Sequence, residues 1–314
     1  MNRILDLRDI IHILYPVLPD SFFYFIAKIQ GQLAYKRNTI LRTVVRGNLA
    51  MLSTASRSES ELDEMTKRFF IGQACREMQR VLMTRMSPKT LEKVLPVTGL
   101  ENIDQALKGG KGIILLASHV NSASNFLLLQ RLRRLGYDAR VAFPNKDDPF
   151  KPSRLGQFLC KISGAQTVLE LIGAFYAQFN IRPIVKCLND NGIVMILGDG
   201  THSASFVKAN FMGRTVFFTT GPINLARMTG ASLIFAVVDG MAPDGLNVII
   251  DESMPVPKTD NQDQDMEQMA QQYASRLEKI LLKDATQWQH LEFNNILEKM
   301  ETVLDQSLTE RLKI

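Results

Sequence analysis

Cysteine is scarce in this sequence. Its 314 residues include three cysteines, Cys75, Cys160 and Cys187, which lie far apart. No pair has the Cys-x-x-Cys spacing of a zinc or redox site, and three scattered thiols give no disulfide framework. The sequence therefore argues against a disulfide-stapled or zinc-ribbon protein and favours a reducing compartment.

Two common catalytic motifs are also missing. No Gly-x-Ser-x-Gly elbow and no Gly-x4-Gly-Lys-Ser/Thr loop occur, which argues against an ordinary serine hydrolase and a P-loop enzyme. Gly198 and Gly200 have the spacing of the first two glycines of a dinucleotide fingerprint, but Ser203 stands at the third position. No helix clearly opens there, so this partial match carries no weight.

The charge is only mildly unbalanced. The formal net charge is +5 and the isoelectric point is about 9.1. This bias favours an acidic partner, such as a membrane surface, an acyl carrier or a phosphorylated acceptor. It is too weak to indicate nucleic acid, and no arginine-rich tract accompanies it.

No uninterrupted apolar run reaches the length of about 18 residues that a membrane-spanning helix needs. The most apolar stretch, Ile10–Ile29, is broken by Pro16, Pro19 and Asp20, and no signal-peptide cleavage site follows it. Basic residues come at its end and after it: Lys28, Lys36, Arg37, Arg42 and Arg46. Two interpretations stay open, namely helices lying on an anionic surface and helices that cover the core of a soluble domain.

Apolar runs typical of buried strands alternate with helical patterns along most of the chain. This alternation predicts an α/β fold, with a mostly parallel central sheet flanked by helices and a helical N-terminal cover. We expect one domain over residues 1–314, helical over 1–90 and α/β over 91–314. Strands are predicted over Ile113–Ala117, Ala139–Phe143, Ile193–Leu197, Leu233–Val238 and Asn247–Ile250, a polar loop over Thr201–Asn210, and helices over Leu100–Leu107, Leu155–Ile162, Leu169–Phe179 and Pro183–Asn189. A longer helix starts at the capping box of Ser58 and Glu61.

Two of the predicted strands end in reactive side chains. His119 follows the strand Ile113–Ala117, just before Asn121 and Ser122 open a helix, and Asp199 follows another strand. Ligands bind at the carboxyl ends of parallel strands, and a helix N-terminus there offers free N–H groups. If the two strands are neighbours, both side chains lie in one site.

A turn with the pattern Phe-x-Gly-Arg supplies a possible anion-binding group. Its Gly213 and Arg214 follow the polar loop, and a guanidinium binds phosphate or carboxylate through two parallel hydrogen bonds. A surface salt bridge is the equally simple alternative for Arg214.

Several stretches carry a family resemblance through their order and spacing. They are Leu33–Tyr35, Arg46–Leu49, the strand with His119, Gly192–Asp199, Phe211–Arg214 and Gly221–Ala231. Together they resemble the bacterial lipid A biosynthesis (lauroyl/myristoyl) acyltransferases, a branch of the lysophospholipid acyltransferases, over almost the whole chain. The resemblance implies transfer of an acyl chain from a coenzyme A or acyl-carrier-protein thioester, with no metal or redox cofactor. It also implies a cytoplasmic protein, either free or peripheral on the inner face of the cell membrane.

The resemblance further implies that His119 is a general base, followed after four residues by an acidic residue that orients and charges it. Ser124 stands at the acidic position here, and Lys146 is the nearest cation to the family's arginine in the loop after the next strand. One explanation is a catalytically inactive lipid- or acyl-carrier-binding relative. The other is an active site whose His119 Nδ1–H bonds to the Ser124 hydroxyl, the Asn121 side chain or a backbone carbonyl.

The active alternative assigns a role to each candidate. In it His119 is the base, Asn121 and Ser124 support it, the Ser122–Ser124 backbone offers oxyanion donors, and Asp199 organises the site. Groups that would bind the anionic part of donor or acceptor are Arg214, Gly213, Ser122 and Lys146. The acceptor is a hydroxyl or an amine, and an amine would depend less on a strong base.

Overall fold

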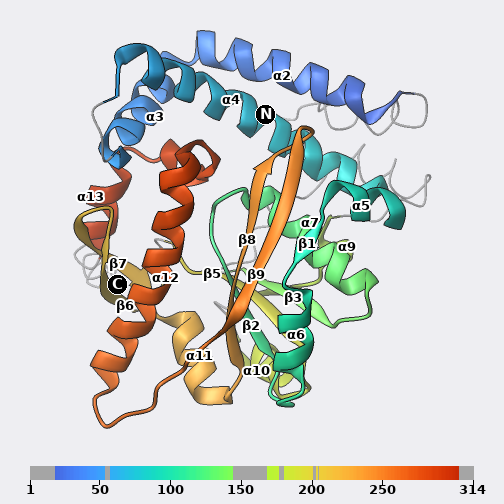
Figure 1. Ribbon diagram of the computed structural model, residues 1–314, viewed down its shortest axis with the longest axis vertical. Helices are drawn as coiled ribbons and strands as arrows, with labels where there is room; N and C mark the ends of the chain where they lie inside the picture. The colour runs from blue at the N-terminus through green and yellow to red at the C-terminus, as the bar shows by residue number, and fades with distance from the viewer. Residues whose placement is uncertain are drawn as a thin grey trace.

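The computed structural model describes residues 18–53, 57–143, 168–176, 180–200, 203 and 205–303. A seven-stranded sheet lies at the centre, in the order β1-β9-β8-β2-β5-β3-β4 (Figure 1). Its strands are β1 Val97–Thr98, β2 Ile113–Ala117, β3 Ala139–Phe143, β4 Ala174–Tyr176, β5 Ile193–Leu197, β8 Ser232–Met241 and β9 Gly245–Met254. All neighbours pair in parallel except β8 and β9. The predicted α/β fold with a largely parallel sheet is confirmed.

The two central strands, β2 and β5, are buried because their sequences are almost wholly apolar. Successive side chains of a strand point to opposite faces, so Ile114 and Leu116 enter the core on one face and Ile113 and Leu115 the core on the other. The strands pair in register, with Ala117 opposite Leu197. They therefore end together, and the residues that follow them reach the same edge of the sheet.

In the described part of the N-terminal cover there are three helices, α2 (Asp20–Arg37), α3 (Thr39–Leu52) and α4 (Glu59–Leu82). The predicted capping box at Ser58 and Glu61 is present at the start of α4. Helix α2 packs along the outside of α4 (Figure 1) and buries Phe23, Tyr24 and Ala27 there. No helix in the described part of the chain is long and apolar enough to cross a membrane.

The remaining helices flank the sheet or follow it. They are η1 Met83–Arg85, α5 Pro88–Val94, α6 Leu100–Leu107, α7 Ser122–Arg134, α9 Val168–Ile172, α10 Arg182–Asn189, α11 Gly221–Thr229, α12 Gln262–Asp284, η2 Ala285–Gln287, η3 Gln289–Glu292 and α13 Ile296–Glu301. The predicted helix Leu155–Ile162 lies outside the described residues. The single domain over 1–314, with its division near residue 90, stays a prediction.

Two predictions of secondary structure were wrong. The expected helix Leu169–Phe179 is a short helix, α9, followed by the strand β4, which pairs with β3. The expected loop Thr201–Asn210 includes most of strand β6 (Phe206–Phe211), which forms a hairpin with β7 (Arg214–Thr219). In both places the strand is short, and pairing with a neighbour decided its conformation over the local pattern.

Candidate active site

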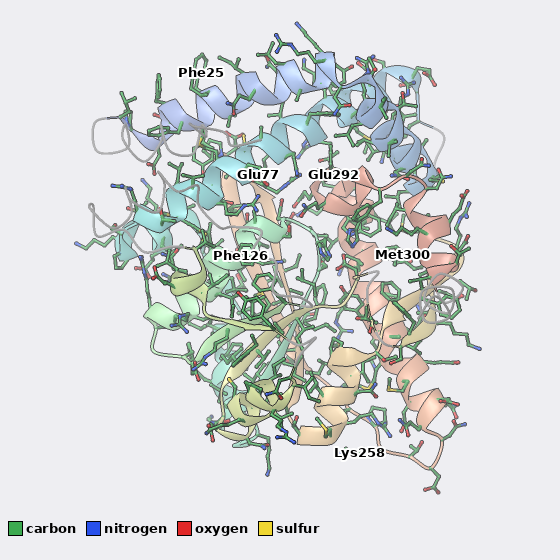
Figure 2. The ribbon with its side chains drawn as sticks, turned by 180° about the vertical axis from the view of Figure 1, so that it is seen from behind. Phe25, Glu77, Phe126, Lys258, Glu292 and Met300 are labelled. Atoms are coloured by element: carbon green, nitrogen blue, oxygen red, sulfur yellow. The ribbon has the colours of Figure 1, made fainter. Side chains whose placement is uncertain are left out.

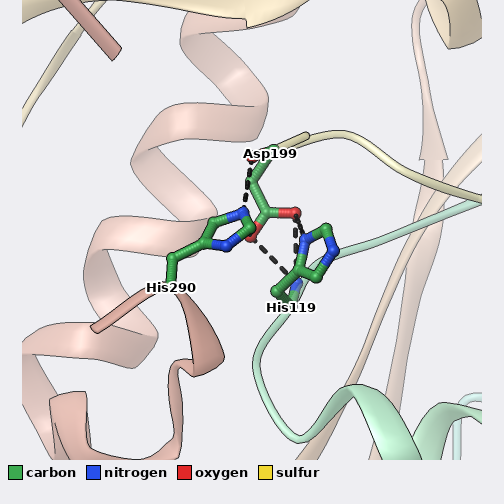
Figure 3. Close-up of side chains that lie close together, drawn as sticks. All are labelled: His119, Asp199 and His290. Atoms are coloured by element: carbon green, nitrogen blue, oxygen red, sulfur yellow. Dashed lines mark hydrogen bonds and ion pairs between the residues drawn. The ribbon is translucent and has the colours of Figure 1, made fainter. Parts of the chain in front are cut away.

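His119 and Asp199 meet at the shared edge of β2 and β5. The Nδ1 atom of His119 lies 2.7 Å from Oδ1 of Asp199 (Figure 3). The main-chain N–H of His119 also donates to this carboxylate, at 3.1 Å to Oδ1 and 2.9 Å to Oδ2. The carboxylate thus holds both the backbone and the ring of the histidine.

Asp199 is fully buried, yet its surroundings keep it ionised. Burial alone would raise the pKa of the carboxyl group, but the neighbouring His119 and a hydrogen bond from Trp288 Nε1 (2.9 Å) outweigh it and hold the pKa below its usual range. An ionised carboxylate only accepts hydrogen bonds, so the Nδ1 of His119 must carry the proton. In the neutral imidazole, Nε2 of His119 is then the nitrogen that can accept a proton, and the side chain is 25% exposed.

The segment after α12 closes around this pair. The main chain of residues 287–289 runs antiparallel to that of 119–121: Asn121 N–H donates to Gln287 O at 2.9 Å and Gln289 N–H to His119 O at 3.0 Å. This pairing places the Trp288 indole on Asp199. The sequence offered no signal for it, because Trp288 lies in a tail with no recognisable motif.

A second histidine, His290, packs against the first. Its ring centroid lies 4.0 Å from that of His119, with 32° between the ring planes. Its Nε2 lies 2.8 Å from the main-chain oxygen of Asp199 (Figure 3). Burial lowers the pKa of His290 to about 3, so this ring is neutral at physiological pH.

Among the described residues, His119, Asp199 and His290 form a group whose ligand atoms lie within 4.8 Å of one another, close enough to hold a metal ion. Those atoms already bond within the group, since both imidazoles face Asp199. The carboxylate also accepts from Trp288. A metal ion would have to displace these hydrogen bonds, so the three side chains suit a hydrogen-bonded arrangement better than a metal site.

A histidine held by a buried carboxylate at the carboxyl edge of a parallel sheet suits proton transfer. Comparison of the whole sequence with known families identifies the family. Residues 7–293 match the family model described as bacterial lipid A biosynthesis acyltransferase. The chain belongs to this family. No curated protein is similar enough to the chain to count as a match. Membership of the bacterial lipid A biosynthesis acyltransferase family supports acyl transfer as the general chemistry.

The structure corrects the expected partner of His119 in this family member. Ser124 donates its hydroxyl to Gln79 Oε1 of α4 at 2.6 Å, and both side chains are buried. Asn121 donates its side-chain amide to the carbonyls of Val238 (2.9 Å) and Gly240 (2.7 Å). The prediction that Ser124, Asn121 or a backbone carbonyl accepts from Nδ1 was wrong, because the carboxylate of the neighbouring strand occupies that position.

The start of α7 offers fewer free donors than expected. The Ser124 N–H bonds to the Asn121 carbonyl at 2.7 Å, so it is not available to an oxyanion. Asn121 itself takes the left-handed conformation, with φ of 45° and no side-chain cap. The Ser122 hydroxyl donates to Gln289. Of the three expected backbone donors, the N–H groups of Ser122 and Ala123 remain as candidates.

Two of the expected anion-binding residues, Arg214 and Gly213, lie in the β6–β7 hairpin. Arg214 begins β7 and forms an ion pair with Glu301 of α13, with Nη1 and Oε1 3.2 Å apart. Gly213 turns the β6–β7 hairpin with a φ of 74°. Arg214 therefore makes the surface salt bridge that was its alternative, and Lys146 lies outside the described residues.

The assignment of Ser124 to packing predicts a loss of stability without a loss of rate. In Ser124→Ala, Gln79 loses its buried partner, and the free energy of unfolding should fall by about 1–3 kcal/mol. Chemical denaturation and thioester turnover measure the two effects. The double variant Ser124→Ala/Gln79→Leu should recover part of the stability, because both polar groups are gone. A rate loss near the roughly 10²-fold of a missing general base would place Ser124 in the chemistry instead.

The buried neutral His290 predicts acid sensitivity of the fold. Its pKa is about 3 in the folded chain, against about 6.5 in an unfolded chain. As the pH falls from about 6.5 towards about 4, the unfolded state takes up a proton that the folded state does not. The free energy of unfolding should then drop by up to about 1.4 kcal/mol per pH unit from this residue. Denaturant titrations should show a shallower drop in His290→Gln, and parallel curves would contradict the assignment.

Proposed function

We propose that this chain transfers an acyl group from an acyl-CoA or acyl-carrier-protein thioester to a hydroxyl or amine acceptor. His119 is the general base, and Asp199 orients and charges it. The observation that carries the proposal is the 2.7 Å contact between His119 Nδ1 and the buried Asp199 carboxylate. It supplies the carboxylate that the family signature has five positions after the histidine and that Ser124 does not provide.

The proton path follows from the tautomer. With Nδ1–H bonded to Asp199, Nε2 takes the proton of the acceptor as the acceptor attacks the thioester carbonyl. The tetrahedral intermediate collapses, the C–S bond breaks, and the imidazolium returns the proton to the departing thiolate. Asp199 stabilises the imidazolium while it exists, and its burial strengthens that attraction because water does not screen it.

The position of Asp199 also bears on the acceptor. An amine acceptor was considered because an uncharged group was expected as the partner of His119. The partner is the carboxylate of Asp199, so this reason for an amine no longer holds. A histidine paired with a carboxylate has the basicity to deprotonate a hydroxyl. The family description points to a lipid among the substrates, so hydroxyl and amine lipids form the acceptor panel.

Replacement of the pair tests the proposal. His119→Ala should lower the rate of acyl transfer by at least roughly 10²-fold. Asp199→Asn should lower it by up to roughly 10⁴-fold, because an amide neither charges the imidazole nor fixes its tautomer. The measurement is thiol release and product formation from a labelled acyl thioester with each acceptor, in variants shown to be folded by circular dichroism. Asp251→Asn, which removes a partly exposed ion pair with Arg276, is the matched control.

The outcomes separate the alternatives. Near-normal transfer by folded His119→Ala protein would refute the role of His119. A wild-type protein that binds the thioester and leaves it intact with every acceptor would be the non-catalytic lipid- or carrier-binding relative.

The proposal includes attachment to a membrane surface through α2. Four apolar residues of this helix, Phe22, Phe25, Ile29 and Leu33, recur at helical spacing and are exposed. Figure 2 shows Phe25 on the outer side of α2, away from the sheet. Lys36 and Arg37 are exposed at the end of the same helix. An apolar face ending in cations suits an anionic bilayer. The opposite face of α2 packs on α4.

Sedimentation with anionic vesicles tests this attachment. The full chain should bind at low salt and less as salt rises, and Phe25→Asp should weaken binding because a charge enters the apolar face. Phe25 is 59% exposed, and Met228 of α11, at the far end of the molecule (Figure 1), is 58% exposed. Met228→Asp is therefore the matched control and should bind as wild type does. Equal binding by both variants, or no binding at low salt, would contradict a role for α2.

A further inference from the structure

We propose that His290 is a positioning residue for the His119–Asp199 pair: it fixes the main chain of Asp199 and one face of the His119 ring. The inference rests on the proposed function, in which that pair moves the proton. His290 has no part in the family signature that identified His119. Three separate observations lead to it.

The first observation is the hydrogen bond to the main chain of Asp199. His290 Nε2 donates to the Asp199 carbonyl oxygen at 2.8 Å. Asp199 lies between Gly198 and Gly200, and glycine leaves a backbone more conformational freedom than other residues do. Within the described part of the chain, His290 is the donor that holds this carbonyl. The bond therefore limits how far the carboxylate can turn away from Nδ1 of His119.

The second observation is the stacking of the two imidazoles. With ring centroids 4.0 Å apart, His290 covers one face of the His119 ring and restricts its rotation. His290 is itself held by aromatic neighbours, Trp288 at 5.3 Å and Phe293 at 5.2 Å between centroids. Because Trp288 also donates to Asp199, the ring of His290 has little room to move independently of the carboxylate.

The third observation is that His290 is arranged to stay neutral. Its Nδ1 is buried and has no hydrogen-bond partner in the described part of the chain, so this nitrogen carries no proton while Nε2 donates. Burial lowers the pKa of His290, as do His119 after β2 and Lys299 of α13, and together they outweigh Asp199 after β5, which raises it. When His119 takes up the acceptor's proton, it therefore meets a neutral ring and not a second cation.

Two substitutions separate the hydrogen bond from the ring. His290→Phe keeps an aromatic ring beside His119 and loses the donor, whereas His290→Gln keeps an amide N–H donor and loses the ring. We expect kcat to fall roughly 10- to 100-fold in His290→Phe, the scale of a small misplacement of catalytic groups, with KM unchanged. His290→Gln should recover most of the rate.

A spectroscopic signature tests the same inference without activity. The Nδ1 proton of His119, bonded to a carboxylate, should give a strongly deshielded proton resonance in wild type and His290→Gln, and a weakened or shifted one in His290→Phe. The chain has four histidines, so single substitutions assign the signal. If His290→Phe does not fold, His290→Met serves as the variant without a donor.

The results discriminate clearly. Folded donor-less variants with wild-type rate and resonance would overturn the inference, and so would equal losses in the Phe and Gln variants, which indicate packing alone. A wild type without any transfer activity whose resonance responds as expected would refute the proposed function and leave the positioning role supported.

Discussion

The buried carboxylate of Asp199 is the group on which the arrangement of the site depends. Removing an ionised carboxylate from water is costly by several kcal/mol unless other groups compensate it. Here the compensation comes from the main chain and ring of His119 and from the indole of Trp288. These donors belong to the end of β2 and to the segment after α12, so the charge can be buried only when both have packed against the end of β5.

The arrangement of the strands explains how His119 can meet a carboxylate although no acidic residue stands five positions after it. In the family signature the acid follows the histidine on the same helix start. In this chain β2 and β5 are adjacent and in register, so the residue after β5 reaches the same Nδ1 atom from the side. The signature position, Ser124, is then free of that role and joins Gln79 in the contact between α7 and α4.

The C-terminal segment is part of the site for the same reason. Residues 287–289 pair with 119–121 through main-chain hydrogen bonds, and this pairing brings Trp288 and the adjacent His290 to Asp199. A buried polar network of this kind is well defined only when every member is satisfied. The Nδ1 of His290, which has no hydrogen-bond partner among the described residues, is the exception, and burial keeps it without a proton.

The sequence by itself determined the elements whose signals are local. Apolar runs predicted β2, β3 and β5 with their observed bounds, and Ser58 marked the start of α4. The ends of two strands identified His119 and Asp199 as candidates, but not that they touch. Only the tertiary structure decided that contact and the packing of Trp288 and His290 against Asp199. The physical reason is that periodicity and caps act over a few residues. These contacts join residues that are up to about 90 positions apart in the sequence, so the packing of the whole chain selects them.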